Sequence, residues 1–322
     1  MFKRGLCRPD YESIVIFSAI VLYSVISTLI IPGKWILGSK LKNGKQLPYK
    51  LNGTWVHLSA IALFVLASRY LHLFDARILY DHYDALLVTD LVFCVALTLF
   101  LYVRSLVWIP AEEQNFHYPK WNLPMNFWVG TELNPHFFGF EIKLFAYRPG
   151  FILLSLLNVS CLAVHYDTYG TVSLPMILFQ LISLWYAIDC FWFESGLVFM
   201  FDIIEENFGF MLVMGDYLWI PFVFSLQAVY LVEQSTIPVW YAVLTVLVFL
   251  IGFYIFRQAN YQKFAFRKDP RVYIWGKPAK ALETKRGTKL MISGWWGVAR
   301  KINYLGDILI AISMSMPCGF TY

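Results

Sequence analysis

Charged residues are scarce in this sequence. Only 15% of its 322 residues are Asp, Glu, Lys or Arg, and 59% are hydrophobic. Ordinary globular domains carry about 25% charged and roughly 45–50% apolar residues. The shortage of charge excludes a typical water-soluble domain and predicts a protein that crosses a membrane several times.

The motifs of several common functional sites are also missing. Five cysteines are dispersed without a CxxC pair and six histidines occur without HExxH, so neither a disulfide framework nor a metal site is indicated. Because GxGxxG and GxxxxGK are absent, any nucleotide is expected to be held by side chains. The cysteines are interpreted as small buried hydrophobes: Cys7, Cys94, Cys161, Cys190 and Cys318.

Long apolar runs are what the sequence does contain. A helix of about 20 residues crosses a bilayer, and the first run, after a short basic N-terminus, lacks a clean cleavage site and is expected to stay in the protein. We predict an all-α, polytopic membrane helical bundle of about seven or eight transmembrane helices, in one domain over residues 1–322. The runs lie at 13–31, 53–74, 85–108, 151–166, 172–192, 208–232, 237–256 and 303–322.

Three connecting segments have a distinct composition. Residues 34–50 carry five lysines and the turn signal KNGK, which predicts a turn between the first two helices. Residues 257–289 are strongly basic, with ten Lys or Arg and only two acidic residues. Residues 109–150 are expected to form an aromatic loop, since proline breaks long helices; its prolines are Pro110, Pro119, Pro124, Pro135 and Pro149.

The basic segment 257–289 has two interpretations. Lys and Arg beside membrane helices favour the cytosolic side, so the charge can reflect topology alone. The same charge also suits an anionic cofactor or a lipid headgroup. The residues by themselves leave this choice open.

Acidic residues gather in one apolar region. Such groups are costly in a bilayer and therefore indicate function, although Glu205 and Glu206 also fit an interfacial turn. Asp216 is flanked by apolar residues, with Pro221 nearby to loosen the helix. A carboxyl buried there keeps its proton and can act as a general acid on an apolar substrate. The cluster comprises Asp189, Glu194, Asp202, Glu205, Glu206 and Asp216.

Four polar or aromatic residues of this region are candidates for substrate contact. Trp192 and Trp219 can line a cavity or pack in a core. Ser225 and Gln227 can contact substrate or bond neighbouring helices. The sequence does not choose between these roles.

Four segments together resemble the sterol reductases of the endoplasmic reticulum. They occur in the family's order, and the second is most similar to the delta-14 reductases. The resemblance implies an integral, multi-pass protein of the endoplasmic reticulum membrane. The segments are GTELNP (130–135), the stretch from DIIEENFGFML to WIPFVFSLQ (202–227), FRQANYQKFAFRKDP (256–270) and SGWWGVARKINYLGD (293–307).

The resemblance also implies a cofactor, NADPH, bound on the cytosolic side by residues 257–304. Lys263 and Arg267 match the positions that hold its phosphates, and Arg and Lys suit that task chemically. Other cofactor-contacting positions are matched by Met291, Trp296, Asn303 and Tyr304.

The implied reaction is NADPH-dependent reduction of the C14–C15 double bond of a sterol 8,14-diene, by protonation and then hydride transfer. Asp216 and Glu194 are the candidates for proton donor or pocket polarity. The implied partners are the sterol, the bilayer and, among proteins, other sterol-pathway enzymes; no nucleic acid or metal is expected. The alternatives are reduction of another sterol double bond, at C7 or C24(28), a non-catalytic truncated sterol-binding relative, and a transporter or channel.

The sequence departs from the family pattern at three places. Near GTELNP, the resemblance predicts an aspartate just ahead of an aromatic pair, and this chain has Asn126 before Phe127 and Trp128. Lys301 stands where the family commonly has histidine, and lysine does not shuttle protons near neutral pH as imidazole does. The family pattern continues beyond the final MPCGFTY through a further helix pair and more cofactor contacts. The resemblance therefore implies a form shortened at its C-terminus.

Overall fold

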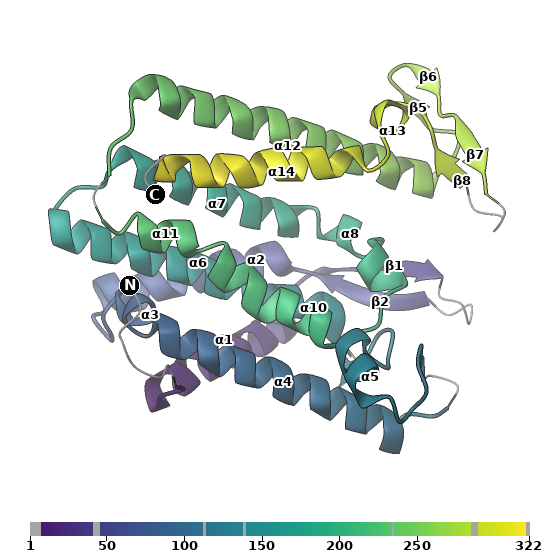
Figure 1. Ribbon diagram of the computed structural model, residues 1–322, viewed down its shortest axis with the longest axis horizontal. Coiled ribbons are helices and arrows are strands. Elements are labelled where there is room, and N and C mark those ends of the chain that lie inside the picture. Colours follow the sequence, from purple (N-terminus) through teal and green to yellow (C-terminus); the bar gives the residue numbers. More distant parts are fainter. Residues whose placement is uncertain are drawn as a thin grey trace. The chain divides into compact units, whose positions relative to one another are not determined.

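A computed structural model shows a mainly helical protein with short β-hairpins (Figure 1). The chain divides into two compact units: residues 1–172 with 184–233 form unit 1, and residues 173–183 with 234–322 form unit 2. The prediction of one integrated domain stays a prediction. The structure describes residues 8–40, 46–111, 114–137, 140–233, 235–284 and 289–319.

Within the described residues, six helices are long and apolar enough to cross a membrane. This confirms the predicted helical membrane bundle. Two further predicted runs form shorter helices: α2 (Gly53–Val65) continues as a π-helix to Tyr70, and α14 (Ile302–Ser315) ends in a 3-10 turn at Cys318. The six are α1 (Tyr11–Ile30), α4 (Tyr83–Val107), α6 (Ile142–Tyr169), α7 (Leu174–Trp192), the interrupted stretch Phe210–Tyr230 and α12 (Val239–Lys268).

Local sequence explains where α1 begins. The Asp10 carboxylate accepts a hydrogen bond from the Ser13 backbone N–H at 2.6 Å, and the Ser13 hydroxyl accepts one from the Asp10 N–H at 3.1 Å. This reciprocal pair satisfies two N–H groups that a helix N-terminus otherwise leaves unpaired. The apolar run that follows then forms one uninterrupted helix.

Helix α6 lies at the centre of unit 1. In its apolar 18-residue stretch, 83% of the residues are buried inside the protein. It begins at Ile142, so the predicted loop 109–150 is wrong over its last part. Glu141 caps the helix by accepting from the Lys143 and Leu144 N–H groups at 3.0 and 2.7 Å. Pro149 lies within the helix and is buried there, although proline removes a backbone hydrogen bond. The remainder of that loop contains α5 (Leu123–Val129) and the β3–β4 hairpin (His136–Phe137, Phe140–Glu141).

The stretch 210–230 is not a regular helix. Its middle is the π-helix η2 (Gly215–Val223), which contains Pro221, so the predicted loosening around this proline is confirmed. Gly150 of α6 lies directly against the Asp216 carbonyl oxygen, leaving no room for a Cβ. The flanking elements are α8 (Glu194–Leu197), α9 (Phe201–Ile204), α10 (Phe210–Met214) and α11 (Leu226–Tyr230), while α3 (Ile78–Asp81) precedes α4.

Two of the segments that carry the family resemblance interlock in unit 1. Gly130 has φ +88°, and a Cβ there would lie 2.5 Å from the Gly209 nitrogen. The Asn207 side chain donates to the Gly130 carbonyl at 3.0 Å, and the Phe208 N–H donates to the Glu132 carbonyl at 3.0 Å. The GTELNP segment therefore has a structural reason for its glycine, because only glycine allows this close backbone approach.

Unit 2 is built on α12 and α14, which pack along each other (Figure 1). At about 1.5 Å per residue, the 30-residue α12 is about 45 Å long and exceeds a hydrocarbon core of about 30 Å. The basic residues 257–268 were expected to begin a loop, but they form roughly the last three turns of α12. Two hairpins follow, β5 (Tyr273–Ile274) with β6 (Lys277–Pro278) and β7 (Ala281–Glu283) with β8 (Lys289–Met291), and then α13 (Trp295–Val298).

Unit 1 has its own hairpin between the first two helices. Strand β1 (Lys34–Lys40) pairs antiparallel with β2 (Gln46–Leu51). The predicted KNGK turn, residues 42–45, lies outside the described residues. The chain reversal expected between the two helices is consistent with this pairing.

Candidate functional site

The basic end of α12 presents two cations one turn apart. Lys263 and Arg267 are four residues apart and therefore lie on one side of the helix. The Lys263 ammonium lies 4.7 Å from the centre of the Trp296 ring, within the range of a cation–π interaction. The Trp296 indole N–H donates to the Ala259 carbonyl at 2.8 Å, which holds the ring against α12.

Gly294 makes this docking possible. Its backbone has φ +61° and ψ −140°, a conformation available essentially only to glycine. A Cβ at Gly294 would collide with the Gln262 side-chain oxygen. That same oxygen accepts the Trp295 backbone N–H at 2.9 Å. The glycine before the tryptophan pair thus lets the Trp-Trp segment contact α12.

Of the three remaining predicted cofactor residues, Asn303 and Tyr304 lie on α14 and Met291 lies on β8. Lys301, with φ +62°, precedes the first turn of α14, and its ammonium lies 5.3 Å from the exposed Tyr304 ring. Asn303 is half-buried, and its side-chain oxygen is buried without a hydrogen-bond partner, as is the Trp295 indole nitrogen. Met291 ends β8 and is half-buried.

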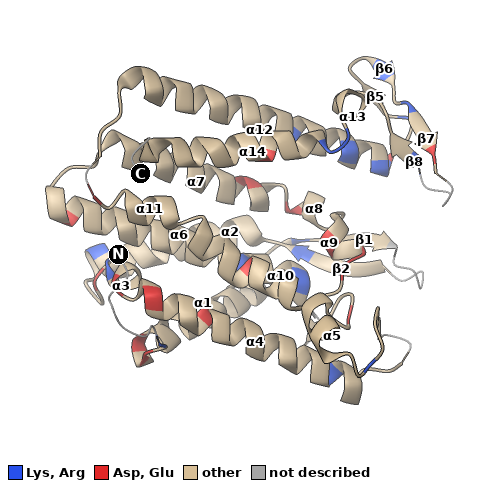
Figure 2. Cartoon of the chain, in the orientation of Figure 1, with Lys and Arg blue, Asp and Glu red and all other residues tan. Residues whose placement is uncertain are grey.

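These groups are chemically suited to an anionic ring-bearing ligand. Figure 2 shows Lys and Arg gathered at the end of α12 and in the segments that follow it. Lys263 experiences repulsion from both Arg267 and Lys301, so an anion placed among the three would relieve it. The Asn303 side-chain oxygen supplies an acceptor for the same ligand, and the Trp295 indole N–H supplies a donor.

A second cluster lies in unit 1 around Asp216. This residue of η2 is 6% exposed, and it interacts electrostatically with Asp202, Lys143 and Glu141. Lys143, on α6, is 1% exposed. Its ammonium donates to three backbone carbonyls, those of Leu133, Asp202 and Glu206, at 2.7, 2.6 and 2.7 Å. All three N–H groups of Lys143 therefore donate to backbone oxygens. Two of these bonds, to Asp202 and Glu206, hold the segment around α9 in place.

Tyr147, one turn after Lys143 on α6, completes this cluster. Its hydroxyl donates to the Asp202 carboxylate. Its ring packs against two apolar clusters, so the phenol lies where apolar and polar regions of unit 1 meet. Sequence reasoning missed Lys143 and Tyr147 because both fall in the stretch expected to be a loop.

Glu194 lies in a buried ion pair. Its carboxylate contacts the Arg148 guanidinium at 2.8 Å and accepts the Gly53 N–H at 3.0 Å. Arg148 also donates to the Thr28 hydroxyl at 2.6 Å and the Lys50 carbonyl at 2.8 Å. The pair therefore joins α1, β2, α2, α6 and α8 within unit 1.

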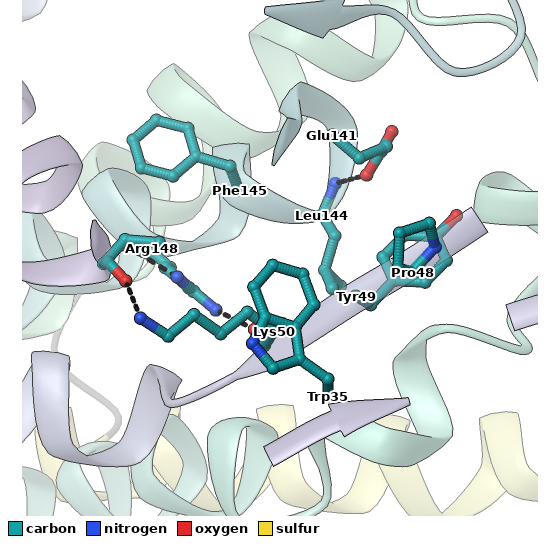
Figure 3. Close-up of a pocket in the computed structure, with 9 residues that line it drawn as sticks. Trp35, Pro48, Tyr49, Lys50, Glu141, Leu144, Phe145 and Arg148 are labelled. Carbon is teal, nitrogen blue, oxygen red and sulfur yellow. Dashed lines mark hydrogen bonds between the residues drawn. The ribbon is translucent and has the colours of Figure 1, made fainter. Parts of the chain in front are cut away.

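A small pocket lies beside this ion pair. Figure 3 shows Trp35 and Tyr49 of the β1–β2 hairpin near Leu144 and Arg148 of α6. Glu141 also lines it, and burial raises the pKa of this carboxyl to about 7 against the opposing effects of the Lys143 charge and two backbone N–H groups. A proton at Glu141 therefore titrates in the neutral range.

The predicted substrate residues divide into two kinds. Trp192 and Trp219 are 68% and 51% exposed. Ser225 is fully buried, donates to the Phe222 carbonyl at 3.2 Å and lies 3.2 Å from the Tyr83 hydroxyl. Gln227 is half-buried. The structure does not bring these four together at one described pocket, and their substrate role stays a prediction.

Asp90 is a buried carboxyl that the sequence analysis missed. It is fully buried in α4, with the Cys94 sulfur 3.7 Å from one of its oxygens and no partner for the other. A single acidic residue within the apolar run 85–108 was the available signal.

Comparison with known proteins places both units in one family. The Ergosterol biosynthesis ERG4/ERG24 family matches residues 1–322. A Delta(14)-sterol reductase of Methylotuvimicrobium alcaliphilum is 38% identical over 321 residues, which cover 99% of this chain and 74% of that protein. A Delta(14)-sterol reductase of Arabidopsis thaliana is 38% identical over 320 residues, 98% of this chain and 85% of that protein. Delta(14)-sterol reductase LBR of Gallus gallus is 38% identical over 299 residues, 90% of this chain and 46% of that protein.

Proposed function

The chain belongs to the Ergosterol biosynthesis ERG4/ERG24 family, and from this premise we propose that it reduces the C14–C15 double bond of sterol 8,14-dienes. The observation that carries the proposal is 38% identity over 98–99% of the chain with relatives named Delta(14)-sterol reductase. The protein is a multi-pass membrane oxidoreductase of sterol biosynthesis, and the endoplasmic reticulum is its proposed location.

The proposed cofactor is NADPH, which supplies the hydride when bound. Lys263 and Arg267 hold its phosphates through charge-assisted hydrogen bonds, and Trp296 offers a flat ring against α12. The unpartnered oxygen of Asn303 supports a polar contact. Met291 and Tyr304 complete the proposed contacts.

Asp216 is the proposed proton donor. A buried carboxyl with few compensating charges favours its neutral form, so Asp216 holds the proton that the alkene requires. Its O–H bond breaks as a C–H bond forms at C15, which leaves a cation at C14 to accept the hydride. Glu194, neutralised by Arg148, contributes polarity and position. Trp192, Trp219, Ser225 and Gln227 are proposed to line the sterol path.

The experiment is sterol profiling in cells that lack their own C14 reductase. Expression of this chain is expected to remove the accumulated 8,14-diene, as measured by gas chromatography of extracted sterols. Lys263→Met, Arg267→Met and Asp216→Asn are each expected to restore the diene, whereas Lys277→Met on β6 is the matched control and is expected to behave as wild type.

Two results would oppose the proposal. Persistence of the diene with the wild-type chain present in the membrane would favour a non-catalytic sterol-binding relative. Disappearance of a C7 or C24(28) alkene in place of the 8,14-diene, in cells blocked at those steps, would favour a different sterol reductase. The positions of the double bonds in the extracted sterols separate these cases.

A further inference from the structure

We propose that Asp202 and Glu206 form a route that returns a proton from solvent to Asp216 after each turnover. The proposal rests on the proposed role of Asp216 as the acid. It assigns a function to two carboxyls that the reaction itself does not use. It is carried by the contacts among α6, α9 and η2 in unit 1.

A buried acid that gives up its proton needs a way to regain it. Asp216 is 6% exposed, so its carboxylate is left in a poorly solvated environment after donation. An unpaired buried charge is strongly unfavourable. Turnover therefore depends on a second group that can deliver a proton to Asp216.

The three carboxyls form a series that ends at a buried group. Glu206, in the segment between the membrane-spanning helices, and Asp202, on α9, are both half-buried, whereas Asp216 in η2 is buried. Asp202 interacts electrostatically with each of the other two. Asp202 is thus the group that links Glu206 to the buried Asp216.

Glu206 is adapted to receive protons. Burial and repulsion from Asp202 raise the pKa of Glu206 above its ordinary value, although the Lys143 charge acts in the opposite direction. A carboxyl with a raised pKa is protonated more often near neutral pH than an ordinary surface glutamate. It can therefore collect a proton that Asp202 then accepts.

Lys143 and Tyr147 hold this series in place. The Lys143 ammonium donates to the backbone carbonyls of both Asp202 and Glu206, at 2.6 and 2.7 Å. The Tyr147 hydroxyl donates to the Asp202 carboxylate. The ammonium therefore fixes the backbone of two members, and its charge stabilises whichever carboxyl is ionised at a given moment.

The other groups near Asp216 are poorer sources of a proton. Glu141 is 5% exposed and already accepts two backbone N–H groups at the start of α6. Phenols and thiols ordinarily titrate at about 8.5–10, so they seldom release a proton to a carboxylate. Among the described residues, the phenols and thiols that interact with Asp216 are Tyr147, Tyr217, Cys94 and Cys190. Lys143 also interacts with Asp216, but its N–H groups are already donated to three backbone carbonyls.

Each transfer in the route is balanced. The O–H bond of protonated Asp202 breaks as one forms on Asp216, directly or through one water. A proton from Glu206 then restores Asp202, and solvent restores Glu206. The net change is one proton taken from solvent for each proton given to the sterol, and no oxidant or reductant is required.

The test compares the first turnover with the later ones. Purified protein is mixed with NADPH and the 8,14-diene sterol, and product is followed by rapid quench over several turnovers. Asp202→Asn is expected to keep a wild-type first turnover and to slow later turnovers by about 100- to 10,000-fold, the typical contribution of a positioned proton-transfer group. Added formate, a small soluble acid, is expected to restore the later rate partly.

Glu206→Gln gives an independent test, because it retains the backbone carbonyl that Lys143 uses. Its later turnovers are expected to slow increasingly as pH rises, since fewer solvent protons are available. The neighbouring exposed Glu205, as Glu205→Gln, is the matched control and is expected to match wild type. This variant pair decides the question even if Asp202→Asn does not fold.

Several outcomes would overturn the proposal. If Asp202→Asn slows the first turnover as much as the later ones, and formate has no effect, the residue only supports structure. If Glu206→Gln keeps the wild-type rate of later turnovers at every pH, Glu206 is not the residue that takes up the proton from solvent. A wild-type first turnover in Asp216→Asn would instead reject the proposed role of Asp216 as the acid. This result does not depend on Asp202→Asn or Glu206→Gln, so the two failures can be distinguished.

Discussion

Gly306 of α14 lies against the backbone of Gly252 in α12: a Cβ at Gly306 would come within 2.7 Å of the Gly252 carbonyl oxygen. Real Cβ contacts are never this short, so Gly306→Ala is expected to push the helices apart. Overpacking typically costs about 1–3 kcal/mol. Because Asn303 and Tyr304 lie on the same turn of α14, NADPH affinity is expected to fall as well. Thermal unfolding in detergent and NADPH titration measure the two effects.

Gly196 in α8 supplies the matched control for that prediction, because a Cβ there meets nothing within 4 Å. Gly196→Ala is expected to leave the thermal midpoint unchanged or to raise it slightly, since alanine favours helix by about 1 kcal/mol. Equal midpoints for the two variants would show that the α12–α14 contact tolerates a side chain.

The Arg148–Glu194 ion pair is expected to be required for folding. Both side chains are nearly fully buried, at 3% and 4% exposure, and removing one partner of such a pair typically costs about 3–5 kcal/mol. Glu194→Gln is therefore expected to lower the thermal midpoint strongly. The double variant Arg148→Met/Glu194→Gln is expected to be more stable than Glu194→Gln alone, because no uncompensated charge remains. A stable Glu194→Gln protein that has lost only its turnover would instead identify Glu194 as the proton donor.

Lys263 is expected to contribute directly to cofactor affinity. A charge-assisted hydrogen bond contributes about 1.5–3 kcal/mol, so Lys263→Met is expected to raise the Kd for NADPH by roughly 10- to 100-fold. Isothermal titration of the purified protein measures this, with the exposed Lys277→Met as control. Because fewer ionic contacts remain, the variant's affinity is also expected to depend less on salt. Identical Kd values for the two variants would place the phosphates elsewhere.

Glu141 is expected to make stability depend on pH. Its pKa rises from an ordinary 4.5 to about 7 in the folded protein because of burial. The folded state therefore binds more protons than the unfolded state between these values, so stability falls as pH rises from about 4.5 to 7 and changes no further above that. The total loss is about 3 kcal/mol.

Thermal midpoints measured in detergent from pH 5 to pH 8 test this expectation. Glu141→Gln removes the titrating group and is expected to flatten the decline, with a small constant loss because one N-cap acceptor is missing. Glu283→Gln on the exposed β7 strand is expected to keep the wild-type decline. An unchanged slope in Glu141→Gln would assign the pH dependence to another group.

The resemblance and the prediction of a helical membrane bundle both depended on local sequence. Hydropathy over about 20 residues identifies a transmembrane helix because each span must be apolar along its whole length. The cluster of acidic residues from Asp189 to Asp216 was visible for the same reason, since charge stands out against an apolar background. Pro221 likewise predicted the interruption that became η2.

Tertiary contacts overrode local signals at α6. The prolines of 109–150 predicted a loop, yet the helix begins at Ile142 because Glu141 caps it and its surroundings bury it. Lys143 and Tyr147 were missed with it. Their partners Asp202 and Glu206 lie 55 to 63 positions away in sequence, a separation that no local pattern reports.

The sequence by itself determined the membrane class, the family segments and the basic C-terminal region, because each is written in consecutive residues. Only the tertiary structure decided that Glu194 pairs with Arg148, that Lys263 faces Trp296, and that Gly294 allows the Trp-Trp segment to contact α12. Such pairings depend on how distant helices pack, and packing is set by shape complementarity across the whole unit rather than by composition along one segment.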